Sequence, residues 1–158
     1  MVESEERPPV VRRVVSKLEA TVCESPTLVG VYGQKAVTPE SVASMLRPLL
    51  EDEPVEVFVA LLLDGRHQVF AYAEVSRGTM TASLVHPREV YGPALRMSAA
   101  AVIVAHNHPS GDPEPSSEDI EVTRRLRDAG KLLGVPLLDH VVLGEGGRHA
   151  SLRRHIEF

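Results

Sequence analysis

The chain has 158 residues, of which 43% are hydrophobic and 25% are charged, and its 17 basic against 22 acidic side chains give a formal net charge of −5. A chain of this length buries about 68–70% of its unfolded surface in a single core, which favours one globular domain and excludes a disordered or fibrous protein. The acidic balance does not support a nucleic-acid partner, because phosphate contacts need a concentrated basic surface. The one cysteine, Cys23, excludes zinc sites built on several thiolates.

The amino-terminal part of the chain gives mixed signals. No apolar run reaches the roughly 18 residues that a membrane-spanning helix needs, and the charged, proline-bearing residues 1–13 are unlike a signal peptide. We therefore expect a cytoplasmic protein with no membrane partner. Residues 1–36 are interpreted as an appendage with a short amphipathic helix near residues 10–18, and residues 37–158 as the domain itself.

The domain opens with a helix and a strand hairpin. The helix is predicted to begin at Pro39, with Thr38 as its N-cap and Ser41 in the third helical position. A nine-residue run with one polar side chain predicts a strand over residues 55–63. The Asp-Gly pair that follows predicts a hairpin into a second strand over residues 67–75.

Strands and helices alternate through the rest of the chain. The pattern predicts a weaker strand over residues 79–85, a helix over residues 90–97, a strand over residues 99–105, a helix over residues 117–133 and a strand over residues 137–143. The third of these is continuously apolar, so helices must cover both faces of its sheet. The class is therefore α/β or α+β around one mixed sheet flanked by helices.

A group of possible metal ligands follows the apolar strand. His106 and His108 are two residues apart, so their imidazoles point to the same side of the sheet. A stiff loop over residues 109–115, with three prolines and a glycine, leads to Ser116 and Asp119 at the start of the next helix. Two nitrogens and one carboxylate oxygen would leave the fourth tetrahedral position of a zinc ion open for water, as in catalytic sites. The alternative is that Ser116 and Asp119 form only a capping box.

The combined string of two histidines, a serine and an aspartate resembles the JAMM motif of the JAB/MPN metallopeptidases. Residues 85–90, 106–113 and 138–140 look like the RadC branch of that superfamily, and the resemblance covers residues 38–152. Full-length RadC-like proteins carry an additional helix-hairpin-helix segment, and residues 1–34 show no counterpart to it.

The resemblance implies a cytidine-deaminase-like α/β fold in which zinc is held by His106, His108 and Asp119. It further implies that an upstream glutamate and the metal activate a water, and that Ser116 stabilises the tetrahedral intermediate. The reaction would be hydrolysis of an amide or isopeptide bond, with a peptide or an isopeptide-linked protein as substrate.

Two further side chains are candidates at this site. The resemblance places the glutamate on the first strand after the opening helix, where Glu56 is the only polar residue; Glu74 and, less favoured, Glu89 are alternatives, and Glu56 could instead lie at the strand start with its head in solvent. His140 follows an aspartate on the last predicted strand and is a candidate second-layer partner of a ligand, although a histidine near a strand start is more often structural.

A second function remains open on the sequence. The chain could be a non-catalytic metal-bearing module for a protein or nucleic-acid partner, with a DNA-repair association, and a homodimer closed over the cleft would favour that interpretation. Asp112 competes with Asp119 as a ligand, but its Gly-Asp-Pro setting is typical of a turn. A zinc nucleobase deaminase is excluded because the chain lacks the cysteine pair which that class requires.

Overall fold

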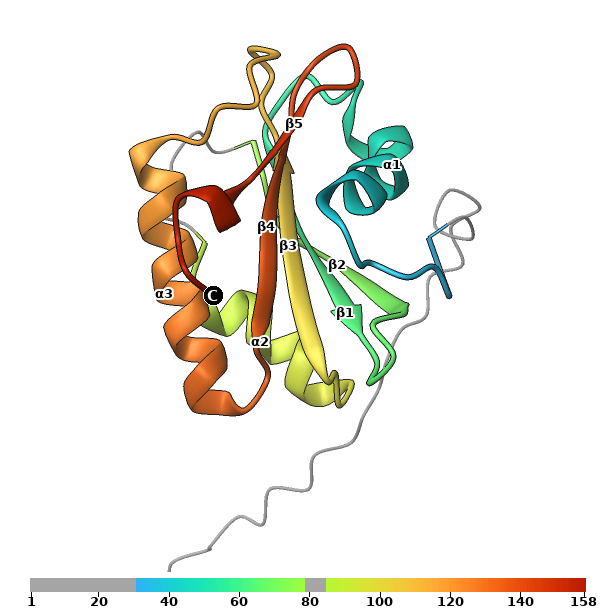
Figure 1. Cartoon of the computed structure of the whole chain (residues 1–158), viewed down its shortest axis with the longest axis vertical. Helices are drawn as coiled ribbons and strands as arrows, with labels where there is room; N and C mark the ends of the chain where they lie inside the picture. The colour runs from blue at the N-terminus through green and yellow to red at the C-terminus, as the bar shows by residue number, and fades with distance from the viewer. Residues whose placement is uncertain (1–30, 79–84) are drawn as a thin grey trace, which may run out of the picture.

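The structure is a computed structural model that describes residues 31–78 and 85–158. One five-stranded mixed sheet forms its centre, with strand order β2-β1-β3-β4-β5 (Figure 1). The β3–β4 pair is parallel and the other neighbouring pairs are antiparallel. The elements are α1 (Pro39–Leu50), β1 (Val57–Leu63), β2 (Val69–Arg77), α2 (Pro87–Arg96), β3 (Ala101–Asn107), α3 (Ser117–Leu133), β4 (Leu137–Leu143), β5 (His149–Ser151) and a short 3-10 helix, η2 (Leu152–Arg154).

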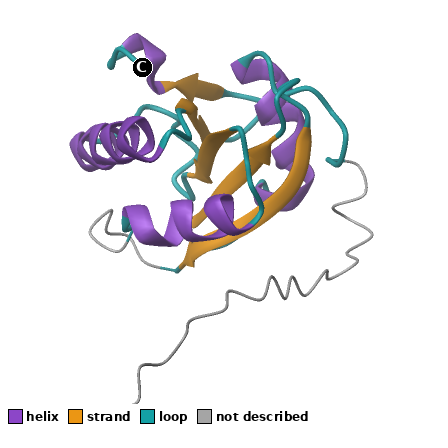
Figure 2. Ribbon diagram, turned by 90° about the horizontal axis from the view of Figure 1, so that it is seen from below, coloured by secondary structure: helices purple, strands orange, loops and turns teal. Residues whose placement is uncertain are grey.

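Helices cover both faces of the sheet. Figures 1 and 2 show α1 on one side, and α2 and α3 on the other. Every residue of β1 and β3 is buried, and alternate side chains join a core beneath α1 or a second core beneath α2 and α3. The prediction of a mixed α/β sheet flanked by helices is confirmed. Among the described residues, no helix combines the length and apolar character needed to cross a bilayer.

The start of α1 follows the sequence prediction. Thr38 is the N-cap, its side chain accepts a hydrogen bond from the backbone N–H of Ser41, and Pro39 occupies the first turn. The Asp-Gly turn does join an antiparallel hairpin, but the connection is longer than two residues. The Asp64 carboxylate accepts from the N–H groups of Arg66 and Gln68, so β2 begins at Val69 instead of residue 67.

Two strand boundaries differ from prediction in a way that matters for the site. β1 begins at Val57, so Glu56 precedes the strand. β3 continues past the apolar run to include His106 and Asn107. The hydrophobic pattern stops at the first polar side chain, whereas the backbone ladder continues because Phe58 pairs with His106. The polar end of β3 therefore lies inside the sheet.

The ends of the chain add features that the pattern did not predict. β5 and η2 are new, because three residues are too few to give a periodic signal. Val31 and Ala36 are buried in the core beneath α1, and a bridge between Lys35 and Gln68 attaches this segment to the start of β2. The predicted helix near residues 10–18, and nearly all of the predicted strand over residues 79–85, lie outside the described residues.

Candidate metal centre

Three predicted ligands lie together at the carboxyl end of β3. The His106 and His108 Nε2 atoms are 3.0 Å apart. Asp119 Oδ1 lies 3.3 Å from His106 Nε2, and Asp119 Oδ2 lies 3.4 Å from His108 Nε2. All three side chains can offer a ligand atom within 4.8 Å of the others. The geometry can therefore address one cation.

Each ligand comes from a different local structure. His106 is fully buried within β3. His108 follows the strand, and its Nδ1 lies 2.7 Å from the backbone oxygen of Asp112. Because a carbonyl only accepts, His108 Nδ1 carries the proton and donates it, which leaves Nε2 with a lone pair when the ring is neutral. Asp112 thus orients a ligand through its backbone, while its carboxylate accepts from the N–H of Glu114 in the turn.

The loop that carries His108 packs closely on the turn after β4. The carbonyl of Gly111 accepts from Glu145 N–H at 2.9 Å and from the Arg148 guanidinium at 2.8 Å. A Cβ on Gly144 would lie 2.6 Å from the same carbonyl oxygen and 2.7 Å from the Pro113 ring. Only glycine permits this approach, so the turn after β4 holds the proline-rich loop in place.

Asp119 is presented by a capping box at the start of α3. Ser116 Oγ accepts from Asp119 N–H at 3.1 Å and donates to Asp119 Oδ2 at 2.7 Å, and the same oxygen accepts from Ser116 N–H. The carboxylate nevertheless faces both histidines. The capping and ligand interpretations, which competed on the sequence, are therefore compatible, because the cap fixes the carboxylate orientation.

The electrostatics of the cluster favour a cation. Burial by itself would raise the pKa of Asp119, but the adjacent His106 and His108 imidazoles hold that pKa well below its usual range. The hydrogen bond with Asp119 raises the pKa of His108. A carboxylate that stays ionised and two inward-facing imidazole nitrogens form a donor set that a divalent metal ion fits. A proton on His108 would compete with that ion.

The three candidate glutamates occupy different surroundings. Glu56 lies two residues before Phe58, whose ring stacks on His106 with a centroid distance of 5.7 Å. Burial raises the pKa of Glu56, and the charges of His106 and His108 act in the opposite direction. Glu74 is ion-paired with a neighbouring arginine, 2.9 Å away, and so is Glu89 at 3.0 Å. Of these three glutamates, only Glu56 has a resolved electrostatic interaction with the two candidate-ligand histidines.

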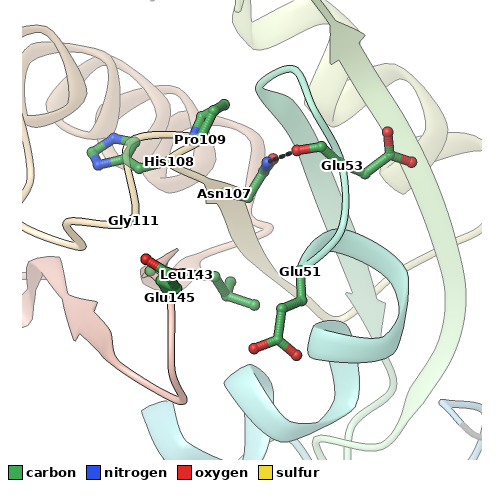
Figure 3. A pocket seen from close by; sticks show the side chains of 9 residues that line it. Glu51, Glu53, Asn107, His108, Pro109, Gly111, Leu143 and Glu145 are labelled. Atoms are coloured by element: carbon green, nitrogen blue, oxygen red, sulfur yellow. Dashed lines mark hydrogen bonds between the residues drawn. The ribbon is translucent and has the colours of Figure 1, made fainter.

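Asn107 was not singled out by sequence reasoning, yet it holds the segment that bears Glu56. Its side-chain oxygen accepts from Val57 N–H at 2.7 Å, and its amide group donates to the carbonyls of Val55 at 3.0 Å and Glu53 at 3.4 Å. Figure 3 shows the contact with Glu53. An asparagine between two candidate ligands in a buried strand was the available signal.

A cavity of about 190 Å³ opens beside this strand end (Figure 3). His108 and Asn107 form part of its wall, and the acidic residues Glu51, Glu53 and Glu145 line it. The first two of these glutamates are ion-paired with arginines. Solvent therefore reaches a candidate ligand through an acidic vestibule.

His140 lies directly behind His106. Its Nε2 is 2.8 Å from His106 Nδ1, and its Nδ1 is 2.6 Å from the Thr123 hydroxyl. Thr123 in turn donates to the Asp119 carbonyl at 2.5 Å. Burial lowers the pKa of His140 well below its usual value, so the ring is neutral. Sequence reasoning missed Thr123, although it lies one helical turn after Asp119.

The fold and the donor set together define an α/β domain of the JAB/MPN type with a candidate divalent-metal centre. The model of the RadC-like JAB domain matches residues 36–157. The chain belongs to this family, as its motif had indicated.

Similar proteins occur in bacteria and archaea. The chain is 48% identical over 116 residues to a UPF0758 protein of Geobacter sulfurreducens, which covers 73% of this chain and 51% of that protein. It is 54% identical over 109 residues to one from Symbiobacterium thermophilum, covering 69% and 47%, and 47% identical over 120 residues to one from Methanosarcina barkeri, covering 76% and 52%. The chain thus spans about half the length of these curated relatives.

Proposed function

We propose that the chain is a zinc-dependent hydrolase that cleaves peptide or isopeptide bonds, with Zn²⁺ held by His106, His108 and Asp119. The observation that carries the proposal is the convergence of these three donors beside the partly buried carboxylate of Glu56. A bound zinc ion would lower the pKa of a coordinated water to about 7 and polarise a carbonyl.

The chain's own residues supply the proton transfers. Glu56 accepts a proton from the attacking water on its carboxylate oxygen as the new C–O bond forms. It later passes that proton to the nitrogen of the departing amine as the C–N bond of the amide breaks. Its pKa, raised by burial, favours a group that both accepts and returns a proton. The hydrogen bonds of Asn107 to the backbone on both sides of Glu56 support a fixed position for that carboxylate.

Ser116 is proposed to have two roles in this scheme. Its hydroxyl orients Asp119 by donating its single proton to the carboxylate at 2.7 Å. It stabilises the oxygen of the tetrahedral intermediate when that proton turns from Asp119 to the substrate. Replacing Ser116 with alanine removes both roles, so stability and hydrolysis rate should both fall. If Ser116 served only as the N-cap of α3, the substitution would lower stability but not the rate. Comparing the free energy of unfolding with the turnover of Ser116→Ala separates the two.

The proposal is tested by metal content and hydrolysis measured on the same preparations. His106→Ala and Asp119→Ala should lose zinc and activity on fluorogenic peptides and lysine-isopeptide substrates. Glu56→Gln should keep zinc and lose about 10²–10⁴-fold in rate. Glu74→Gln is the matched control, because Glu74 is already neutralised by an arginine partner, and it should behave as wild type.

Two outcomes contradict the proposal in different ways. If Glu74→Gln loses activity and Glu56→Gln does not, the base is Glu74. If wild type binds zinc but hydrolyses neither class of bond, the chain is a metal-bearing binding module for a protein or nucleic-acid partner.

A further inference from the structure

A chain of buried hydrogen bonds connects two of the candidate ligands from behind. It runs from the backbone carbonyl of Asp119 through the Thr123 hydroxyl and the His140 ring to His106. Thr123, His140 and His106 are all fully buried. The three links join α3, β4 and β3, so the chain connects two ligands that belong to different elements.

The direction of this chain is fixed at one end. The Asp119 carbonyl can only accept, and its oxygen lies 2.5 Å from Thr123 Oγ1, so the single hydroxyl proton of Thr123 lies between them. The 2.6 Å contact of Thr123 Oγ1 with His140 must then be donated by His140 Nδ1. A neutral His140 therefore has a lone pair on Nε2, which accepts a proton from His106 Nδ1 at 2.8 Å.

We propose that Thr123 and His140 are positioning residues that lock His106 in the Nδ1–H tautomer and so leave its Nε2 lone pair free for a cation shared with His108 and Asp119. This inference rests on the metal-binding part of the proposed function and is independent of hydrolysis. Thr123 does not line the cavity. Its role is to accept the hydrogen bond from His140 Nδ1, which sets the direction of the hydrogen bonds that follow.

Packing alone does not account for these side chains. An imidazole and a hydroxyl placed in an apolar core cost free energy unless every polar atom is paired. Here each polar atom of the buried side chains in the described part of the chain has a partner. The Phe58 ring packs against both imidazoles, with its centroid 5.2 Å from His140 and 5.7 Å from His106, and all three rings are buried from bulk solvent.

The first test uses nitrogen chemical shifts of the imidazoles in the metal-free 158-residue chain. Long-range ¹H–¹⁵N correlation spectra should show His140 and His106 both protonated on Nδ1 and bare on Nε2. Thr123→Val removes the acceptor for His140 Nδ1–H at nearly constant volume. His140 should then move its proton to Nε2, which forces His106 to carry its own proton on Nε2, the atom that faces Asp119.

The second test is Zn²⁺ affinity, measured by competition with a chromophoric chelator. Thr123→Val should weaken binding by about 10–100-fold, the usual effect of removing a partner behind a ligand. Thr123→Ser keeps the hydroxyl and should restore both affinity and tautomer. Val122→Ala, at a buried neighbour on α3, controls for general destabilisation and should lower the free energy of unfolding without weakening zinc binding.

The outcomes separate this inference from the proposed function. If Thr123→Val keeps wild-type zinc affinity and unchanged tautomers, the inference is wrong even for an active hydrolase. An unfolded Thr123→Val variant leaves the decision to the wild-type spectra, in which a proton on His140 Nε2 would overturn the inference. A wild-type chain that binds no zinc would contradict the proposed function, while the spectra would still decide the tautomer assignment.

Discussion

The two faces of the sheet differ at the carboxyl ends of β3 and β4. Toward α1, Ala105 and Val141 are fully buried in an aliphatic core. Toward α3, His106 and His140 are equally buried, although imidazoles lose more on leaving water. Stability alone would favour aliphatic residues on both faces. The polar face is therefore explained by what its hydrogen bonds hold in place, and the aliphatic face by packing.

The largest effect is expected from the aliphatic face. Leu61→Ala removes a fully buried side chain beneath α1 and should lower the free energy of unfolding by about 2–5 kcal/mol in urea titrations. The zinc affinity of the folded molecules should not change, because Leu61 contacts no part of the polar chain. A joint loss of stability and of zinc affinity would break the distinction between the two faces.

Asn107 is the polar exception near the aliphatic face. Asn107→Ala leaves the buried Val57 N–H without its 2.7 Å partner and should cost about 1–3 kcal/mol of unfolding free energy. Gln68→Ala is the matched control, because its amide makes a 3.2 Å bond to a backbone carbonyl at an exposed site, and it should change stability by less than about 0.5 kcal/mol. Equal losses in the two variants would contradict the role given to Asn107.

The sequence predicted the elements whose signals are local. The cap at Thr38, the bounds of α3 and the bounds of β4 all follow from residues adjacent to one another in the chain. The motif was sufficient to name His106, His108 and Asp119 because strand alternation and a stiff loop act over short distances. The positions of these three donors relative to one another depend on only two consecutive elements.

What could not be predicted depends on contacts between distant segments. Thr123 and His140 are 17 residues apart, and their link arises only because α3 packs against β4. Asn107 holds residues some 50 positions away. The start of β1 was misplaced because its first pairings, Val57 with Arg77 of β2 and Phe58 with His106 of β3, are not set by its own hydrophobic pattern. Such contacts leave no periodic signal in a single sequence.

The pH dependence of stability and of zinc affinity tests whether His108 is a ligand. The Asp119 carboxylate raises the pKa of His108 above its ordinary value of 6.5, so in the metal-free protein this pair stabilises the fold below pH 6.5 and the contribution is lost as pH rises through the folded-state pKa. Zinc needs the neutral ring. Below the folded-state pKa of His108, the affinity for zinc should rise about tenfold per pH unit, or about 1.4 kcal/mol. Above that pKa, where His108 is neutral, the affinity should level off.

Calorimetry at several pH values checks this expectation. Zinc binding below the folded-state pKa of His108 should release about one proton from that ring. The stability of the metal-free chain should fall as pH rises from 6.5 through that folded-state pKa. As pH rises, zinc affinity should therefore increase while the stability of the metal-free chain decreases. A zinc affinity that does not change with pH below the folded-state pKa would show that His108 is not a ligand.

The smallest expected effect comes from a hydrogen bond between α2 and α3, which tests whether any loss of stability on the α3 side of the sheet weakens the candidate metal centre. The Tyr91 hydroxyl is buried and donates to the Leu126 carbonyl at 2.8 Å, which joins α2 to α3. Tyr91→Phe should cost about 0.5–1.5 kcal/mol of unfolding free energy, whereas Tyr72→Phe, whose hydroxyl makes no hydrogen bond within residues 31–78 and 85–158, should cost almost nothing. Neither should alter zinc affinity, since the hydrogen bonds from Asp119 to His106 stay intact. If Tyr91→Phe weakens zinc as much as Thr123→Val, the centre responds to packing across the whole face, and the polar chain has no special role.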